Sequence, residues 1–82
     1  MHIAISNFSP ETTIDEIRQA LEDFGVSIRD ITLENDEDGD HTLALVDVDT
    51  DELGAKALAE RINGHVWKGR RLRARAYLFI NK

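Results

Sequence analysis

The sequence contains no cysteine and a single proline in 82 residues. Without cysteine the chain forms neither disulfides nor thiolate metal sites, and it has no Cys nucleophile. A chain of this length buries only about 60–65% of the surface that its unfolded form exposes, which is enough for one modest core. We therefore expect one domain over residues 1–82, located in the cytoplasm, without the deep active site of a complex enzyme.

Long apolar runs are also missing. The opening residues lack a basic leader, and no window approaches the roughly 18 apolar residues that a membrane helix requires. Hydrophobic residues make up 41% of the chain and charged residues 32%, which is typical of soluble globular domains. We expect no contact with a membrane.

Positive charge is scarce overall but concentrated in one part of the chain. The net charge is -6, from 16 acidic and 10 basic side chains. Residues 1–55 hold 15 acids and 2 bases, whereas residues 56–82 hold 1 acid and 8 bases. The net charge therefore does not describe the field near the C-terminal segment, and it does not exclude an anionic ligand. Five of the bases lie close together: Lys68, Arg70, Arg71, Arg73 and Arg75.

Hydrophobic periodicity predicts six elements in the order βαββαβ. The expected strands cover residues 2–6, 26–34, 41–48 and 71–77, and the expected helices cover residues 13–24 and 50–62. In the first helix, Thr13 and Glu16 have the spacing of a capping box, and Gly25 is suited to end the helix. The apolar face of this helix is expected to hold Ile14, Ile17, Leu21 and Phe24.

This order predicts an α+β fold of the ferredoxin-like type, in which a four-stranded antiparallel sheet carries two helices on one face. The other face of the sheet is then open. In the last strand, alternation directs Leu72, Ala74 and Ala76 toward the helices. The same alternation sends Arg71, Arg73, Arg75 and Tyr77 to the open face.

Several short motifs fit the same fold. Residues 3–8 read Ile-Ala-Ile-Ser-Asn-Phe, residues 62–64 read Ile-Asn-Gly, and a Lys68-Gly69 turn precedes the last strand. Together with the expected strand at residues 41–48, these motifs resemble the RNA recognition motif, and the resemblance covers almost the whole chain. It implies a domain that binds single-stranded RNA, or another single-stranded nucleic acid, without catalysis and without a cofactor.

In that family, aromatic side chains on the first and third strands stack on bases, and a basic residue meets phosphate. The matching aromatic positions here carry Ala4, Leu43 and Leu45, and the basic position carries His41. The motifs are therefore degenerate, and the resemblance implies weak binding or little sequence preference. The candidate RNA-binding residues are Ala4, Ser6, Thr32, His41, Leu43, Leu45, Arg71, Arg73, Arg75 and Tyr77.

A second reading treats the domain as a protein-interaction module. Ala4, Leu43 and Leu45 would then form an apolar patch that docks a protein partner or a second copy of the domain. An enzyme ranks third, because no nucleophile or acid–base arrangement is visible. The acidic residues 34–40 do not complete a calcium loop, since position 12 of such a loop would be Leu45. His2, His41 and His65 lie in separate elements, so we expect no metal site.

Overall fold

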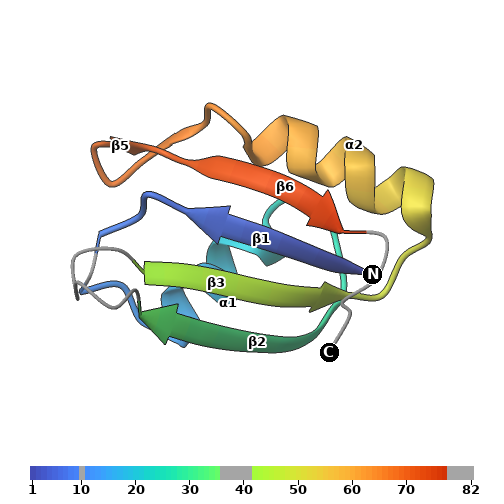
Figure 1. The fold of residues 1–82 in the computed structure, drawn as a ribbon, viewed down its shortest axis with the longest axis horizontal. Helices are drawn as coiled ribbons and strands as arrows, with labels where there is room; N and C mark the ends of the chain where they lie inside the picture. The colour runs from blue at the N-terminus through green and yellow to red at the C-terminus, as the bar shows by residue number, and fades with distance from the viewer. Residues whose placement is uncertain (10, 36–41, 78–82) are drawn as a thin grey trace.

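The computed structural model describes residues 1–9, 11–35 and 42–77, which form one sheet layer and one helix layer (Figure 1). The sheet has four antiparallel strands in the order β2-β3-β1-β6, so β2 and β6 lie at its two edges. This arrangement confirms the predicted α+β class. The elements are β1 (His2–Ser6), α1 (Ile14–Glu22), β2 (Ile28–Asn35), β3 (Thr42–Val48), α2 (Glu52–Ile62), β4 (Val66–Trp67), β5 (Arg70–Arg71) and β6 (Arg73–Tyr77).

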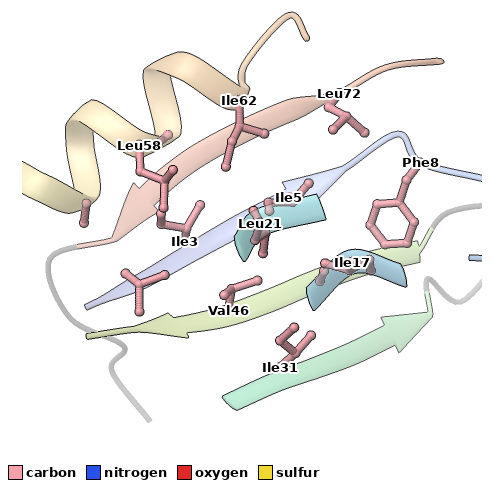
Figure 2. Close-up of a cluster of buried hydrophobic side chains, with 14 residues drawn as sticks. Ile3, Ile5, Phe8, Ile17, Leu21, Ile31, Val46, Leu58, Ile62 and Leu72 are labelled. Atoms are coloured by element: carbon pink, nitrogen blue, oxygen red, sulfur yellow. The ribbon is translucent and has the colours of Figure 1, made fainter. Parts of the chain in front are cut away.

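One hydrophobic core fills the space between the sheet and both helices. Ile3 and Ile5 of β1 and Val46 of β3 pack in one cluster with residues of α1 and α2, and Figure 2 shows them in this cluster with Leu21 and Ile62. Ile3 and Ile62 are each 1% exposed. Burying one such side chain contributes about 1.5–3 kcal/mol. Since both helices share this core, the opposite face of the sheet is left uncovered by them.

The ends of α1 follow the predicted signals. The Thr13 hydroxyl accepts a hydrogen bond from the Glu16 backbone N–H, and the Glu16 carboxylate accepts one from the Thr13 N–H. Gly25 has a φ of 85°, a conformation that glycine adopts without steric cost. Ile17 and Leu21 are buried as expected, but Ile14 is 38% exposed. The sequence pattern predicts Ile14 on the apolar face of the helix, but as the first helical residue it does not join the core cluster.

The helix α2 begins after Asp51, whose carboxylate accepts a hydrogen bond from the Gly54 N–H. Its four buried residues are Ala55, Leu58, Ala59 and Ile62. Small residues on this face allow the helix to approach the sheet closely. No helix in residues 1–9, 11–35 and 42–77 has the length and apolar character to cross a membrane.

The second strand contains an irregularity that its sequence pattern did not reveal. The register shifts between Ile28 and Asp30, as in a β-bulge. Ile28 and Ile31 are out of phase in a regular strand, yet both contact the core. A bulge inserts one extra residue into one strand, so it allows both side chains to reach the same face.

The fourth predicted strand is interrupted. Residues 73–77 form β6, but Arg71 belongs to β5, which pairs with β4 in a separate two-stranded sheet. Lys68 and Gly69 connect β4 and β5 with φ values of 53° and 77°, as a type I′ hairpin turn requires. The prediction of one continuous strand over residues 71–77 is therefore wrong, although the predicted turn is confirmed.

Candidate nucleic-acid interface

Among the described residues, three cross-strand rows make up the open face of the sheet, which is the face opposite the helices. Directly opposed residues of an antiparallel pair lie on the same face, and β1 pairs with both β3 and β6, so the register extends across the sheet. From β6 to β2 the rows read Arg73, Ser6, Leu43, Glu34; then Arg75, Ala4, Leu45, Thr32; then Tyr77, His2, Asp47, Asp30.

Charge changes sign across this face. The β6 edge carries the guanidinium groups of Arg73 and Arg75, both on exposed residues. On the opposite part, Asp30, Glu34 and Asp47 form what we call the acidic side, and Asp30 lies directly opposite Asp47. The centre is aliphatic. An anionic polymer on this face would therefore be attracted to one edge and repelled from the other.

The central positions offer little flat surface. Ala4 is only 7% exposed, and it lies between the longer side chains of Arg75 and Leu45, its partners on the two neighbouring strands. Leu43 and Leu45 are half-buried. Thr32, in the same row as Leu45, is exposed, whereas Ser6 is half-buried. The predicted residues of β1, β2, β3 and β6 thus share one face, but Ala4 is too small and too buried to act as a platform.

Arg71 does not join this row. It is exposed on β5, where its Cα partner is Val66, and its carbonyl accepts a hydrogen bond of 2.7 Å from the Asn7 side chain. The prediction that Arg71 lies on the open face of the four-stranded sheet is therefore wrong, because the strand is interrupted at Leu72 and Arg71 belongs to β5. His41 lies outside the described residues. The backbone of Tyr77 pairs with that of His2 at the end of β6.

A polar hollow that no sequence pattern predicts lies beside the end of β1. It has a volume of about 390 Å³ and is lined by Asn7, Asn63, Gly64, Arg71, Leu72 and Arg73. The Asn63 side-chain oxygen accepts a hydrogen bond of 3.1 Å from the Ala74 N–H, so the turn after α2 is tied to β6. The Asn-Gly pair after a helix signalled a turn in the sequence, but not that the turn would meet two arginines.

A larger groove lies on the helix side. It has a volume of about 640 Å³, and its lining includes Ile17, Phe24, Trp67 and Lys68. Trp67 packs against the core, and the Lys68 ammonium lies 5.1 Å from the centre of its ring. The same ammonium pairs with the Glu16 carboxylate. The hydrogen bond from Lys68 is the main cause of a lowered pKa of Glu16, and the hydrogen bond from the Thr13 N–H is the second cause.

An ion pair also tethers the start of β2. The Arg29 guanidinium donates a hydrogen bond of 2.9 Å to Asp49, which raises the pKa of Arg29. Within the described ranges no group of three or more His, Asp or Glu side chains is arranged to hold a metal ion.

Known proteins share this geometry. The family model of the RNA recognition motif matches residues 3–73. A comparison with curated proteins gives no match. Among solved structures, the N-terminal three RNA binding domains of the yeast splicing factor Prp24 match 90% of the chain at 26% identity, with a TM-score of 0.75. The chain spans only 31% of that structure.

Two other structures match most of their own length. Pes4 RRM3 has a TM-score of 0.79 at 22% identity, covering 99% of this chain and 95% of that one. The Rna15 RRM with bound RNA (GU) has a TM-score of 0.73 at 13% identity, covering 96% of this chain and 86% of that one. At these identities the two structures establish the fold alone. With the family model over residues 3–73, the chain belongs to the RNA recognition motif family, whose members are RNA-binding domains without enzymatic activity.

Proposed function

We propose that this domain binds single-stranded RNA on the open face of its sheet, with weak affinity and little sequence preference. The observation that carries the proposal is the β6 edge, where Arg73 and Arg75 lie directly opposite Ser6 and Ala4 of β1. Guanidinium groups recognise phosphate through paired N–H donors. Family membership supports RNA as the ligand, and the similar Rna15 RRM is a structure with bound RNA.

The aliphatic centre accounts for the expected weakness. A base stacked on an aromatic side chain gains about 1–3 kcal/mol, whereas Leu43 and Leu45 offer only apolar contact. The motifs of β1 and β3 are thus degenerate at the positions that would face the RNA. Affinity would then come mainly from phosphate contacts, which do not distinguish one base from another.

The acidic side limits how far the RNA extends. Asp30, Glu34 and Asp47 occupy the β2 half of the outer rows, where they repel a polyanion. The bound strand would therefore follow β6, β1 and the near part of β3. Thr32 and Leu45, in the middle row, form the uncharged boundary of this footprint.

The alternative reading, docking of a protein or a second copy on Ala4, Leu43 and Leu45, has less support. Ala4 is 7% exposed and Leu43 and Leu45 are half-buried, so the three residues present little apolar area. Interaction surfaces on small proteins usually expose larger apolar patches.

A salt-dependent RNA titration tests the proposed function. A labelled pool of short single-stranded RNAs is titrated at two ionic strengths while backbone amide shifts are followed. We expect saturable shifts in β1, β3 and β6 and binding that weakens steeply with salt. Absence of saturable shifts at low salt would contradict the proposal.

Charge reversal locates the site. The double variant Arg73→Glu, Arg75→Glu should abolish binding, because both side chains are on exposed residues of the β6 edge. The matched control is Lys56→Glu, Arg61→Glu, which changes the net charge equally but on exposed residues of α2. If both double variants weaken binding equally, the net charge and not the β6 edge determines affinity.

A further inference from the structure

The polar hollow adjoins the open face but is not part of it. It is lined by residues from the end of β1, the turn after α2 and the passage from β5 to β6. Hydrogen bonds join these three segments, whose ribbons lie near one another in Figure 1. Arg73 belongs to both surfaces, because it lines the hollow and lies directly opposite Ser6 in the sheet. A ligand that runs along the β6 edge therefore reaches the hollow without a gap.

Backbone hydrogen bonds fix the two arginines on either side of Leu72. The Gly64 N–H donates to the Leu72 carbonyl at 2.8 Å, and the Leu72 N–H donates to the His65 carbonyl at 2.8 Å. The Leu72 side chain is 7% exposed and belongs to the core. In an extended segment, side chains alternate between two sides. The buried Leu72 thus turns its exposed neighbours Arg71 and Arg73 away from the core.

No described residue in the walls of the hollow offsets its positive charge. The Asn7 amide is committed to the Arg71 carbonyl at 2.7 Å, and the Asn63 side-chain oxygen is committed to the Ala74 N–H. No acidic side chain is among the described residues that line the hollow. Neither Arg71 nor Arg73 forms an ion pair within residues 1–9, 11–35 and 42–77, whereas Arg29 and Lys68 do. The hollow is thus lined by two arginines, and arginine supplies the donors and the charge that a phosphate requires.

We propose that the polar hollow is a phosphate subsite, with Arg71 and Arg73 as its cationic residues. The inference rests on the proposed function and deepens it, because it places one phosphate of the bound strand beyond the sheet, at the β4–β5 hairpin. The phosphate is either an internal phosphodiester or a terminal monoester, and both present the same anionic oxygens. With this subsite, Arg71 would contact the bound RNA although it lies on β5, outside the four-stranded sheet.

The test compares two adjacent arginines. Arg70 and Arg71 are both exposed and together make up β5, but only Arg71 lines the hollow. Binding of a single-stranded RNA hexamer is measured for Arg71→Gln and Arg70→Gln. Loss of a charge-assisted contact should weaken binding of the Arg71 variant about tenfold, while the Arg70 variant stays within about twofold. The salt slope should fall by about 0.7 only for Arg71→Gln, as expected when one phosphate contact to a single strand is lost.

A second variant and a second ligand make the result decisive. Asn63→Asp keeps an acceptor for the Ala74 N–H but adds a negative charge to the hollow, so it should weaken binding as Arg71→Gln does. Hexamers with a 5′-phosphate, a 3′-phosphate or neither distinguish the source. A preference for one phosphorylated end that Arg71→Gln removes indicates a terminal monoester, and equal affinities indicate an internal phosphodiester.

The outcomes separate the subsite from the proposed function. If Arg71→Gln and Arg70→Gln weaken RNA binding equally while Arg73→Glu, Arg75→Glu abolishes it, the subsite is refuted and the RNA function stands. Inorganic phosphate provides the converse test. If the unchanged protein binds no RNA but phosphate shifts the amides of Asn63 and Gly64 in a saturable way, the subsite stands and the proposed function fails.

Discussion

Asp30 of β2 lies directly opposite Asp47 of β3, so two carboxylates occupy one cross-strand position on the open face. Like charges in this arrangement destabilise an antiparallel pair by about 0.2–1 kcal/mol. Core packing does not require either carboxylate, since both lie on the face away from the helices. The Met1 ammonium lies 3.6 Å from the Asp47 carboxylate and offsets part of this repulsion. The remaining repulsion is a cost for folding and, on the proposed function, has a use in limiting where RNA binds.

Neutralising the acidic side should raise both the stability of the domain and its affinity for RNA. Asp30→Asn is expected to raise the free energy of unfolding by up to about 1 kcal/mol. The double variant Asp30→Asn, Glu34→Gln should bind short RNA severalfold more tightly at low salt, because a repulsive charge at about 4 Å is worth only about 1 kcal/mol in water. Urea denaturation and RNA titration measure the two effects.

The control is the double variant Glu22→Gln, Glu60→Gln, which makes the same change of charge at exposed residues of α1 and α2. A gain in RNA affinity of the same size in this variant would show that net charge, not the position of the carboxylates, limits binding.

Restoring an aromatic ring at the centre of the open face should strengthen binding. Leu45 lies opposite Ala4 and Thr32, so a ring at this position would meet few bulky neighbours. Leu45→Phe is expected to gain about 1–3 kcal/mol of stacking with one base, which corresponds to about five- to 150-fold in affinity. Fluorescence anisotropy with a labelled hexamer measures the change.

Leu53→Phe is the matched control, because Leu53 is 76% exposed on α2 and lies outside the four-stranded sheet. An equal gain in both variants would mean that any added apolar surface attracts RNA. No gain for Leu45→Phe would place the bases elsewhere than on the central row.

Local signals predicted the helix caps and the two faces of each regular strand, because capping and alternation depend on residues a few positions apart. Thr13, Glu16 and Gly25 are examples in α1. The errors concern features that depend on distant partners. Arg71 leaves the sheet because Leu72 exchanges backbone hydrogen bonds with Gly64 and His65, and nothing in the alternation of residues 71–77 indicates that exchange.

The candidate site shows the same difference between local signals and features that depend on distant partners. Alternation placed Arg73 and Arg75 on the open face, but the burial of Ala4 depends on its neighbours Leu45 and Arg75 in other strands. The polar hollow needs three segments to meet, and its charge becomes visible only when Arg71 and Arg73 are seen around one space. Sequence patterns describe single elements, whereas sites between elements require the register.

The core should be sensitive to loss of volume at α2. Ile62 is 1% exposed and packs in the cluster shared by the sheet and both helices (Figure 2). Ile62→Ala should lower the free energy of unfolding by about 2–5 kcal/mol, and Ile62→Val by about 0.5–1.5 kcal/mol. Thermal and urea unfolding followed by circular dichroism test both values. A cost for Ile62→Ala below that of Ile62→Val would contradict the packing described here.

The ion pair between Glu16 and Lys68 should make stability depend on pH in a defined window. The hydrogen bond that Glu16 accepts from Lys68, and secondly the one from the Thr13 N–H, lower the pKa of Glu16 below the ordinary value of 4.5. A carboxylate with a lowered pKa stabilises the folded state above its unfolded-state pKa, and this contribution is lost as pH falls through the folded-state pKa. Below pH 4.5 the stabilisation by Glu16 should therefore decline.

Glu16→Gln isolates this effect, because glutamine still offers an oxygen to the Thr13 N–H but does not titrate. Urea unfolding of both proteins at several pH values between 3 and 7 should show the variant less stable at neutral pH, with the difference shrinking below pH 4.5. Lys68→Gln should remove most of the pH-dependent difference, since it deletes the main cause of the lowered pKa. A difference that stays constant from pH 7 to pH 3 would mean that ionisation of Glu16 does not contribute to stability, and it would contradict this prediction.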